Sequence, residues 1–227
     1  MGKLYGLIFD VDGVIADTEG PTAEATIKVF EDSFGIKGVR PEDFEAGIGR
    51  GAEAYIKAAA RVHGLELTNE QLTQAVETRE QNFIRLLERS PLPAFPGVLE
   101  LMEAALARPD FRLAIATSSS REMSEVALKG AKVPYHKMAY VSGSDVKNKK
   151  PHPEIFLLAA QRTGISPENC VVIEDSPGGV EAAKAAGAKC IAVTNTAAAE
   201  KLSEADLVCD SLAEIDLETV TKLVEGN

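Results

Sequence analysis

Two carboxylates directly after the first apolar run are the residues whose spacing most clearly suggests chemistry. The run covers residues 3–9 and stops at Asp10 and Asp12, and Gly13 follows. Residues i and i+2 of a strand lie on the same side, so the two carboxylates are expected close together. Like charges that close repel unless a cation shares them, and their oxygens suit Mg²⁺. The pattern therefore predicts a magnesium site, although Asp-x-Asp-Gly alone is equally typical of a polar turn.

Three later segments place further polar groups at the end of an apolar run or just before a helical pattern. They are residues 117–120 (TSSS) after the run 113–116, residues 149–154 (KKPHPE), and residues 174–176 (EDS) after the run 171–173. In order, the chain offers carboxylates, hydroxyls, lysines and carboxylates again. Catalysis of phosphoryl transfer needs such a set: a nucleophile, hydrogen-bond donors, a fixed cation and a metal ion. Ser176 is also a candidate N-cap, with Pro177 at the first helical position.

These four segments together resemble the motifs of the haloacid dehalogenase superfamily, in the family's order and over nearly the whole chain. The resemblance is carried by Asp10 to Val14 (DVDGV), Thr117, Lys150-Pro151 and Glu174-Asp175. Segments 10–19, 150–156 and 174–176 are most similar to the branch of β-phosphoglucomutases and sugar phosphatases. The resemblance implies a Mg²⁺-dependent phosphatase for a small phosphorylated metabolite, such as a sugar phosphate or a phosphoglycolate-like acid.

The resemblance also implies roles for the carboxylates. Asp10 would be the nucleophile that attacks phosphorus and forms an aspartyl-phosphate. Asp12 would protonate the leaving alcohol and then activate a water molecule as a base. Mg²⁺ would be held by an Asp10 oxygen, the backbone carbonyl of Asp12, Asp175 and Glu174, with water and phosphate completing six ligands.

The resemblance places the phosphoryl oxygens on the second and third motifs. Thr117, the backbone N–H of Ser118, and Ser119 would bind these oxygens, and Lys150 would offset their charge. Lys150 is preferred because it directly precedes a proline, as in the family pattern. Two other lysines nearby remain alternatives for that role: Lys147 and Lys149.

Strand–helix alternation must position these groups. From about residue 91, apolar runs at 113–116, 138–141, 171–173 and 189–193 alternate with helical patterns at 121–131, 153–163, 177–186 and 197–202. Such alternation is typical of an α/β fold, a doubly wound, Rossmann-like parallel sheet with helices on both faces. Ligands bind at the carboxyl edge of open α/β sheets, and all four motifs are expected at that edge.

Residues 17–90 break this alternation and predict a smaller all-helical cap domain. Helical patterns cover 21–34, 51–63 and 69–87, and Thr68 with Gln71 forms a possible capping box before the last of them. The predicted organisation is therefore a catalytic core of residues 1–16 and 91–227, with residues 17–90 as the cap. In the family that the chain resembles, such an insert is mobile and closes over the edge of the sheet.

Substrate contacts are expected from a glycine-rich segment of the cap, residues 47–51 (GIGRG). A nucleotide-binding fingerprint would need a preceding strand, which this segment lacks. We expect Gly47 and Gly49 to form a substrate loop and Arg50 to contact phosphate or carboxylate, because arginine binds such groups with two hydrogen bonds. A helix-linking turn with a solvated Arg50 is the alternative. Glu19 is a further candidate substrate ligand at the start of the cap.

Composition limits the partners. The chain has 227 residues and a formal net charge of −11, which disfavours nucleic acid, and no apolar run reaches a membrane span. No signal segment is evident, so a cytoplasmic location is the default expectation. Cys170, Cys190 and Cys209 lack metal-site spacing and are expected as buried free thiols. The expected partner is a small phosphorylated metabolite; a monomer is expected, with a dimer as the alternative.

Particular residues of the sequence argue against each of three alternative functions. β-Phosphoglucomutases carry a cap histidine where this chain has Thr22, and threonine cannot shuttle a proton near neutral pH, which favours hydrolysis over a mutase. Dehalogenases lack the second carboxylate, which is present here as Asp12. A non-catalytic binding protein on the same fold would have lost a motif residue, and none is lost. The sequence does not fix the physiological substrate.

Overall fold

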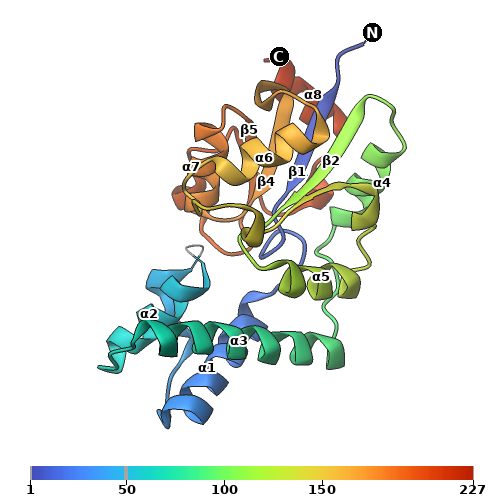
Figure 1. Cartoon of the computed structure of the whole chain (residues 1–227). Coiled ribbons are helices and arrows are strands. Elements are labelled where there is room, and N and C mark those ends of the chain that lie inside the picture. Colours follow the sequence, from blue (N-terminus) through green and yellow to red (C-terminus); the bar gives the residue numbers. More distant parts are fainter. Residues whose placement is uncertain (1, 49–50, 227) are drawn as a thin grey trace.

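The chain folds into a parallel sheet covered by helices on both faces, with a group of helices beyond one end of the strands (Figure 1). The computed structural model describes residues 2–48 and 51–226. Both termini lie at the end of the sheet opposite to the helical group (Figure 1). Within the described residues, no helix combines the length and apolar character that crossing a bilayer requires.

The sheet has the strand order β3-β2-β1-β4-β5-β6, and every pair is parallel. The strands are β1 (Tyr5–Phe9), β2 (Phe111–Ala116), β3 (Ala139–Val141), β4 (Cys170–Glu174), β5 (Lys189–Val193) and β6 (Leu207–Cys209). Phe9 at the end of β1 pairs with Ile115 of β2 and Ile173 of β4, so the three central strands end level with one another. The strand order reverses at β1, which is the switch point where open α/β sheets bind ligands.

Both faces of the sheet are buried, as the apolar strand sequences predict. Tyr5, Leu7 and Phe9 of β1 pack in one apolar cluster with helices from one face, and Ile8 packs in the other. The first face carries α4 (Val98–Leu106), α5 (Arg121–Gly130) and α8 (Leu217–Glu225). The second carries α6 (Glu154–Thr163) and α7 (Pro177–Ala185). The predicted doubly wound sheet is confirmed.

Short elements differ most from the sequence-based expectations. The helix predicted over residues 197–202 is a 3₁₀ helix, η5 (Ala199–Leu202), which buries only Leu202 and has no side-chain N-cap. A four-residue segment without a capping side chain has too few backbone hydrogen bonds to sustain an α-helix. The other 3₁₀ helices are η1 (Pro41–Gly47), η2 (Tyr135–Lys137), η3 (Gly143–Asp145), η4 (Pro167–Asn169) and η6 (Leu212–Glu214).

The helical group has its own apolar core. It consists of α1 (Glu19–Phe34), η1, α2 (Ala52–Val62) and α3 (Asn69–Arg89), and its cluster includes Phe30, Phe44 and Ile56. The predicted capping box at the start of α3 is confirmed, since the Thr68 hydroxyl accepts the Gln71 N–H and the Gln71 side chain accepts the Thr68 N–H. α3 also lies beside α5, which joins this group to the sheet (Figure 1).

Candidate functional site

A cavity of about 600 Å³ lies between the carboxyl edge of the sheet and the helical group. Because β1, β2 and β4 end level, the residues that follow them are brought together at this edge. The predicted site residues that line the cavity are Asp10, Asp12, Glu19, Gly47, Ser118, Ser119, Lys150 and Asp175. Gly49 and Arg50, which the sequence also predicts for the site, lie outside the described residues.

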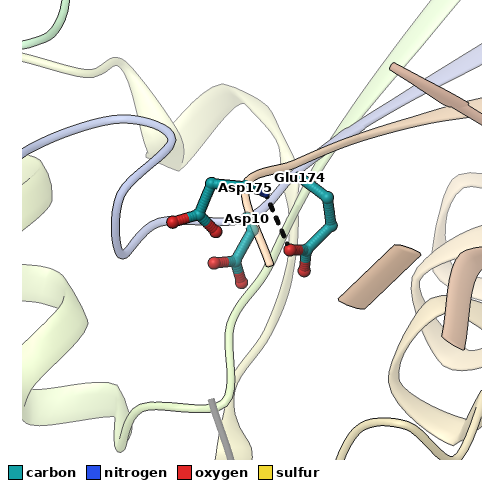
Figure 2. Close-up of side chains that lie close together, drawn as sticks. All are labelled: Asp10, Glu174 and Asp175. Carbon is teal, nitrogen blue, oxygen red and sulfur yellow. Dashed lines mark hydrogen bonds between the residues drawn. The ribbon is translucent and has the colours of Figure 1, made fainter. Parts of the chain in front are cut away.

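Three buried carboxylates form the centre of the site: Asp10, Glu174 and Asp175 come from the ends of β1 and β4, and one oxygen of each lies within 4.8 Å of the others (Figure 2). The exposed fractions of these residues are 5%, 0% and 4%. Lys150 is the cation among them, with its Nζ 2.7 Å from Asp10 Oδ1 and in an ion pair with Glu174. Three carboxylates and one ammonium carry a formal charge of −2 when all are ionised.

Burial and mutual repulsion disturb the titration of this cluster. Burial raises the pKa of Asp10 to about 8, with Glu174 adding to the effect and Lys150 opposing it. The pKa of Asp175 is also raised, by burial first and then by Glu174 and Asp10. Burial alone would lower the pKa of Lys150, but the carboxylates of Asp10 and Glu174 outweigh it. The cluster therefore carries an excess of negative charge. A hard divalent cation, which prefers oxygen ligands, fits both this charge and the donor atoms present.

Glu174 holds the turn between β4 and α7. Its Oε2 accepts the N–H groups of Asp175 at 3.0 Å and Ser176 at 3.1 Å, and the Ser176 hydroxyl at 3.0 Å, while Oε1 pairs with Lys150. The bond from the Asp175 N–H is the dashed line of Figure 2. Gly179 in α7 leaves room for this carboxyl group, since a Cβ there would lie 1.9 Å from the Glu174 carboxyl carbon. Ser176 caps α7 through the Gly179 N–H and Pro177 is its first residue, as predicted.

In the turn after β1, the backbone of Gly13 lies close to the Asp175 carboxylate. Gly13 has a φ of +77°, and a Cβ at this position would lie 1.9 Å from Asp175 Oδ2 and 2.4 Å from the Thr196 hydroxyl. Few L-residues adopt this φ, and none with a Cβ would fit. The Asn195 side chain donates to the Gly13 carbonyl at 2.8 Å, which ties the turn to the segment after β5.

The Asp12 carboxylate has separate partners. Its Oδ1 accepts the Thr18 hydroxyl at 2.6 Å, and its Oδ2 accepts the hydroxyls of Ser119 at 2.7 Å and Thr117 at 3.1 Å. The cluster around Asp10 that could hold a metal does not include this carboxylate. A cation shared by the two aspartate side chains, the first expectation from their spacing, is therefore not what the structure arranges. The Asp12 ligand implied by the family resemblance is the backbone carbonyl, which stays a prediction.

The three candidate lysines occupy different surroundings. Lys147 is exposed, and the ammonium of Lys149 donates to the Gly143 carbonyl at the rim of the cavity. Lys150 is 6% exposed, and its ammonium alone among the three contacts Asp10. This placement supports the sequence-based preference for Lys150.

The helical group contributes a polar cluster that the sequence reasoning only partly identified. Glu19, the first residue of α1, accepts the Tyr55 hydroxyl at 2.7 Å. The Arg79 guanidinium carbon lies 5.5 Å from the centre of the Tyr55 ring, and all three residues line the cavity. Arg79 was missed, although a signal existed: it shares the buried stripe of α3 with Leu72 and Phe83, where a charged residue is unusual.

Comparison with known proteins identifies a family and several relatives of this chain. A family model described as haloacid dehalogenase-like hydrolase matches residues 7–193. Hexitol phosphatase A of Escherichia coli (strain K12) is 32% identical over 225 residues, which are 99% of this chain and 98% of that protein. The crystal structure of CbbY from Rhodobacter sphaeroides with xylulose-(1,5)bisphosphate has a TM-score of 0.85 at 27% identity, covering 96% of this chain and 99% of that one.

A third relative is much longer. Protein SUPPRESSOR OF QUENCHING 1, chloroplastic, of Arabidopsis thaliana is 31% identical over 226 residues, which are 96% of this chain. The chain spans only 21% of the length of that protein.

Proposed function

The chain belongs to the haloacid dehalogenase-like hydrolase family, and we propose that it is a Mg²⁺-dependent phosphatase for a small phosphorylated sugar or sugar alcohol. The observation that carries the proposal is the buried Asp10–Lys150 pair at 2.7 Å, beside Asp175 and facing a cavity of about 600 Å³. That volume is in the range of small-ligand sites. The likeness to hexitol phosphatase A supports a polyol or sugar phosphate as substrate.

The proposed reaction has two steps. In the first, an Asp10 oxygen attacks phosphorus, the bond from phosphorus to the ester oxygen breaks, and Asp12 gives that oxygen its proton. In the second, water attacks the aspartyl-phosphate and loses its proton to Asp12, which releases inorganic phosphate and restores Asp10. Hydroxyl groups of Thr18, Thr117 and Ser119 contact the Asp12 carboxyl group and hold it in place at the cavity.

Charge stabilisation is assigned to the remaining motif residues. Lys150 orients Asp10 and offsets the charge of the phosphoryl oxygens, and the Ser118 N–H binds these oxygens. The Thr117 hydroxyl, also expected to bind them, instead donates to Asp12 and accepts the Ser119 N–H. Asp10, Asp175, the Asp12 carbonyl and Glu174 would hold Mg²⁺. When bound, this ion would offset part of the negative charge of the buried cluster and of the phosphoryl group.

Hydrolysis is favoured over a mutase reaction by the lining of the cavity. A phosphosugar mutase must move a proton at the sugar hydroxyl, which an imidazole does well near neutral pH. Thr22 lines the cavity, and no histidine does so among residues 2–48 and 51–226. Asp12 alone can then serve as acid and base, which suffices for transfer to water.

The test is phosphate release from a panel of phosphorylated polyols, sugars and short acids, with Mg²⁺ and with excess chelator. We expect turnover of at least one polyol or sugar phosphate, lost on chelation and regained when Mg²⁺ is added back. Undiminished turnover in chelator would remove the metal from the proposal. Turnover confined to non-sugar substrates would remove the substrate class.

A further inference from the structure

Arg79 is a buried cation without a matched anion. It is 6% exposed, and its Nε has no hydrogen-bond partner among the described residues. Its guanidinium lies over the Tyr55 ring, where a cation–π contact compensates only part of the lost hydration. Burial accordingly lowers the pKa of Arg79, while Tyr55, Asp12, Glu80 and Glu19 act in the opposite direction. An unpaired buried cation is costly, and because Arg79 lines the cavity, a ligand bound there can compensate its guanidinium group.

The neighbours of Arg79 determine what that ligand can be. Glu19 Oε1 accepts the Tyr55 hydroxyl at 2.7 Å, and no hydrogen bond of the described residues uses Oε2. The cluster therefore presents a donor, Arg79, beside an acceptor, Glu19. A hydroxyl group both donates and accepts and can satisfy both at once. A second phosphate group can only accept, and it would face the carboxylates of Glu19 and Glu80, which line the same cavity.

The cluster is placed where the carbon chain of a substrate must pass. Glu19 directly follows Thr18, whose hydroxyl donates to Asp12 at 2.6 Å. Asp12 is the proposed proton donor to the leaving oxygen, so the carbons bonded to that oxygen start beside Asp12. Asp12, Glu19 and Arg79 all line one cavity, and the distal part of the substrate extends from the first toward the other two.

We propose that Arg79 and Glu19, with Tyr55 holding Glu19, bind the distal hydroxyls of the substrate. The substrate is accordingly a polyhydroxylated monophosphate with a neutral distal end, and not a bisphosphate. The inference rests on the proposed phosphatase function and refines its substrate class. Arg79 is assigned to substrate choice and has no part in the bond-breaking steps.

The experiment compares kcat/KM for a hexitol monophosphate, a hexose bisphosphate and an aryl phosphate in the wild type, Arg79→Gln and Tyr55→Phe. Arg85→Gln is the matched control, because Arg85 is an exposed arginine on the same helix. We expect Arg79→Gln to lower the ratio of hexitol phosphate to aryl phosphate turnover by about ten- to a hundredfold, the loss of one charged hydrogen bond. Tyr55→Phe should lower it less, and Arg85→Gln should leave it unchanged.

Unfolding temperatures separate recognition from structure. Removing an unpaired buried charge should leave the melting temperature of Arg79→Gln unchanged or raised. A lowered melting temperature with an unchanged substrate ratio would make Arg79 a structural residue and overturn the proposal. Wild-type preference for the bisphosphate, lost in Arg79→Gln, would overturn it in favour of a second phosphate site.

Binding measurements keep this inference separate from the proposed reaction. Titration of the hexitol phosphate into Asp10→Asn protein, with and without Arg79→Gln, does not depend on turnover. Binding weakened by about tenfold or more in the double variant supports the assignment, and equal binding overturns it. Absence of wild-type turnover on every substrate counts only against the phosphatase function.

Discussion

Replacement of Lys150 by methionine should expose the charge imbalance of the site most directly. Lys150 is 6% exposed and pairs with both Asp10 and Glu174, so Lys150→Met changes the formal charge of the cluster from −2 to −3 without opening a large cavity. Removing one partner of a buried ion pair costs about 3–5 kcal/mol, because the other charge is left unpaired. We expect a loss of this size at pH 8 in the absence of divalent cations.

The pH dependence of this loss has a definite sign. Asp10 has a pKa raised to about 8 in the folded protein, and that of Asp175 is raised too, compared with about 4 for an unfolded aspartate. A raised carboxyl pKa contributes stability that is complete below the unfolded value and is lost as pH rises through the folded value. The penalty of Lys150→Met should therefore shrink toward pH 5, where the crowded carboxylates take up protons, and Mg²⁺ should reduce it at pH 8.

The assay is urea unfolding of the wild type and Lys150→Met at pH 5 and pH 8, each with and without Mg²⁺. Lys147→Met is the control, since Lys147 is exposed and its ammonium makes no contact with the cluster. Its stability should stay within about 0.5 kcal/mol of the wild type. Equal stability of wild type and Lys150→Met at pH 8, or a penalty that is the same at both pH values, would refute the electrostatic reasoning.

Four further outcomes follow from the site. Asp10→Asn should abolish phosphate release and leave the melting temperature unchanged or higher; residual activity above about one per cent of wild type would contradict the nucleophile assignment. Ca²⁺ should support little turnover, because its longer ligand distances misplace phosphorus; full activity with Ca²⁺ would count against the Mg²⁺ site. Gly179→Ala should lower both melting temperature and activity, since its Cβ would lie 1.9 Å from the Glu174 carboxyl carbon, and a wild-type melting curve would argue against this packing. Because Thr22 lines the cavity where a mutase would have a cap histidine, the protein should release phosphate from β-glucose 1-phosphate supplied with a trace of the bisphosphate. Conversion to glucose 6-phosphate without phosphate release would show a mutase.

Sequence periodicity identified the parts of the fold that bury most surface. The central strands β1, β2 and β4 each contain an apolar run of three or more residues, which predicts a buried strand. The start of α3 is specified by its capping box. β6 was not predicted; it is an edge strand of three residues, the first two only partly buried. A segment of three residues is too short to show a hydrophobic period by itself, and β3, equally short, was predicted as part of a four-residue run, 138–141. Pairing with β5 makes β6 a strand.

For the site, too, the sequence indicates the residues next to predicted elements, whereas contacts between distant segments require the structure. Asp10, Lys150 and Asp175 could be found from spacing, because each follows a strand or precedes a helix at the same sheet edge. The partners of Asp12 could not, since its hydroxyl donors include Ser119, which is separated from it by more than a hundred residues. Arg79 was hidden for a related reason: within α3 it occupies a core position, and only the arrangement of α1, α2 and α3 turns that position into a cavity wall.

The proposed reaction requires a covalent bond between Asp10 and phosphorus. Rapid acid quenching during turnover, followed by mass spectrometry of the digested protein, measures that bond directly. We expect one phosphoryl group on the peptide that contains Asp10 in the wild type, and none in Asp10→Asn. A phosphoryl group on Ser118 or Ser119, or turnover with no phosphorylated peptide under conditions that preserve acyl phosphates, would contradict the central claim.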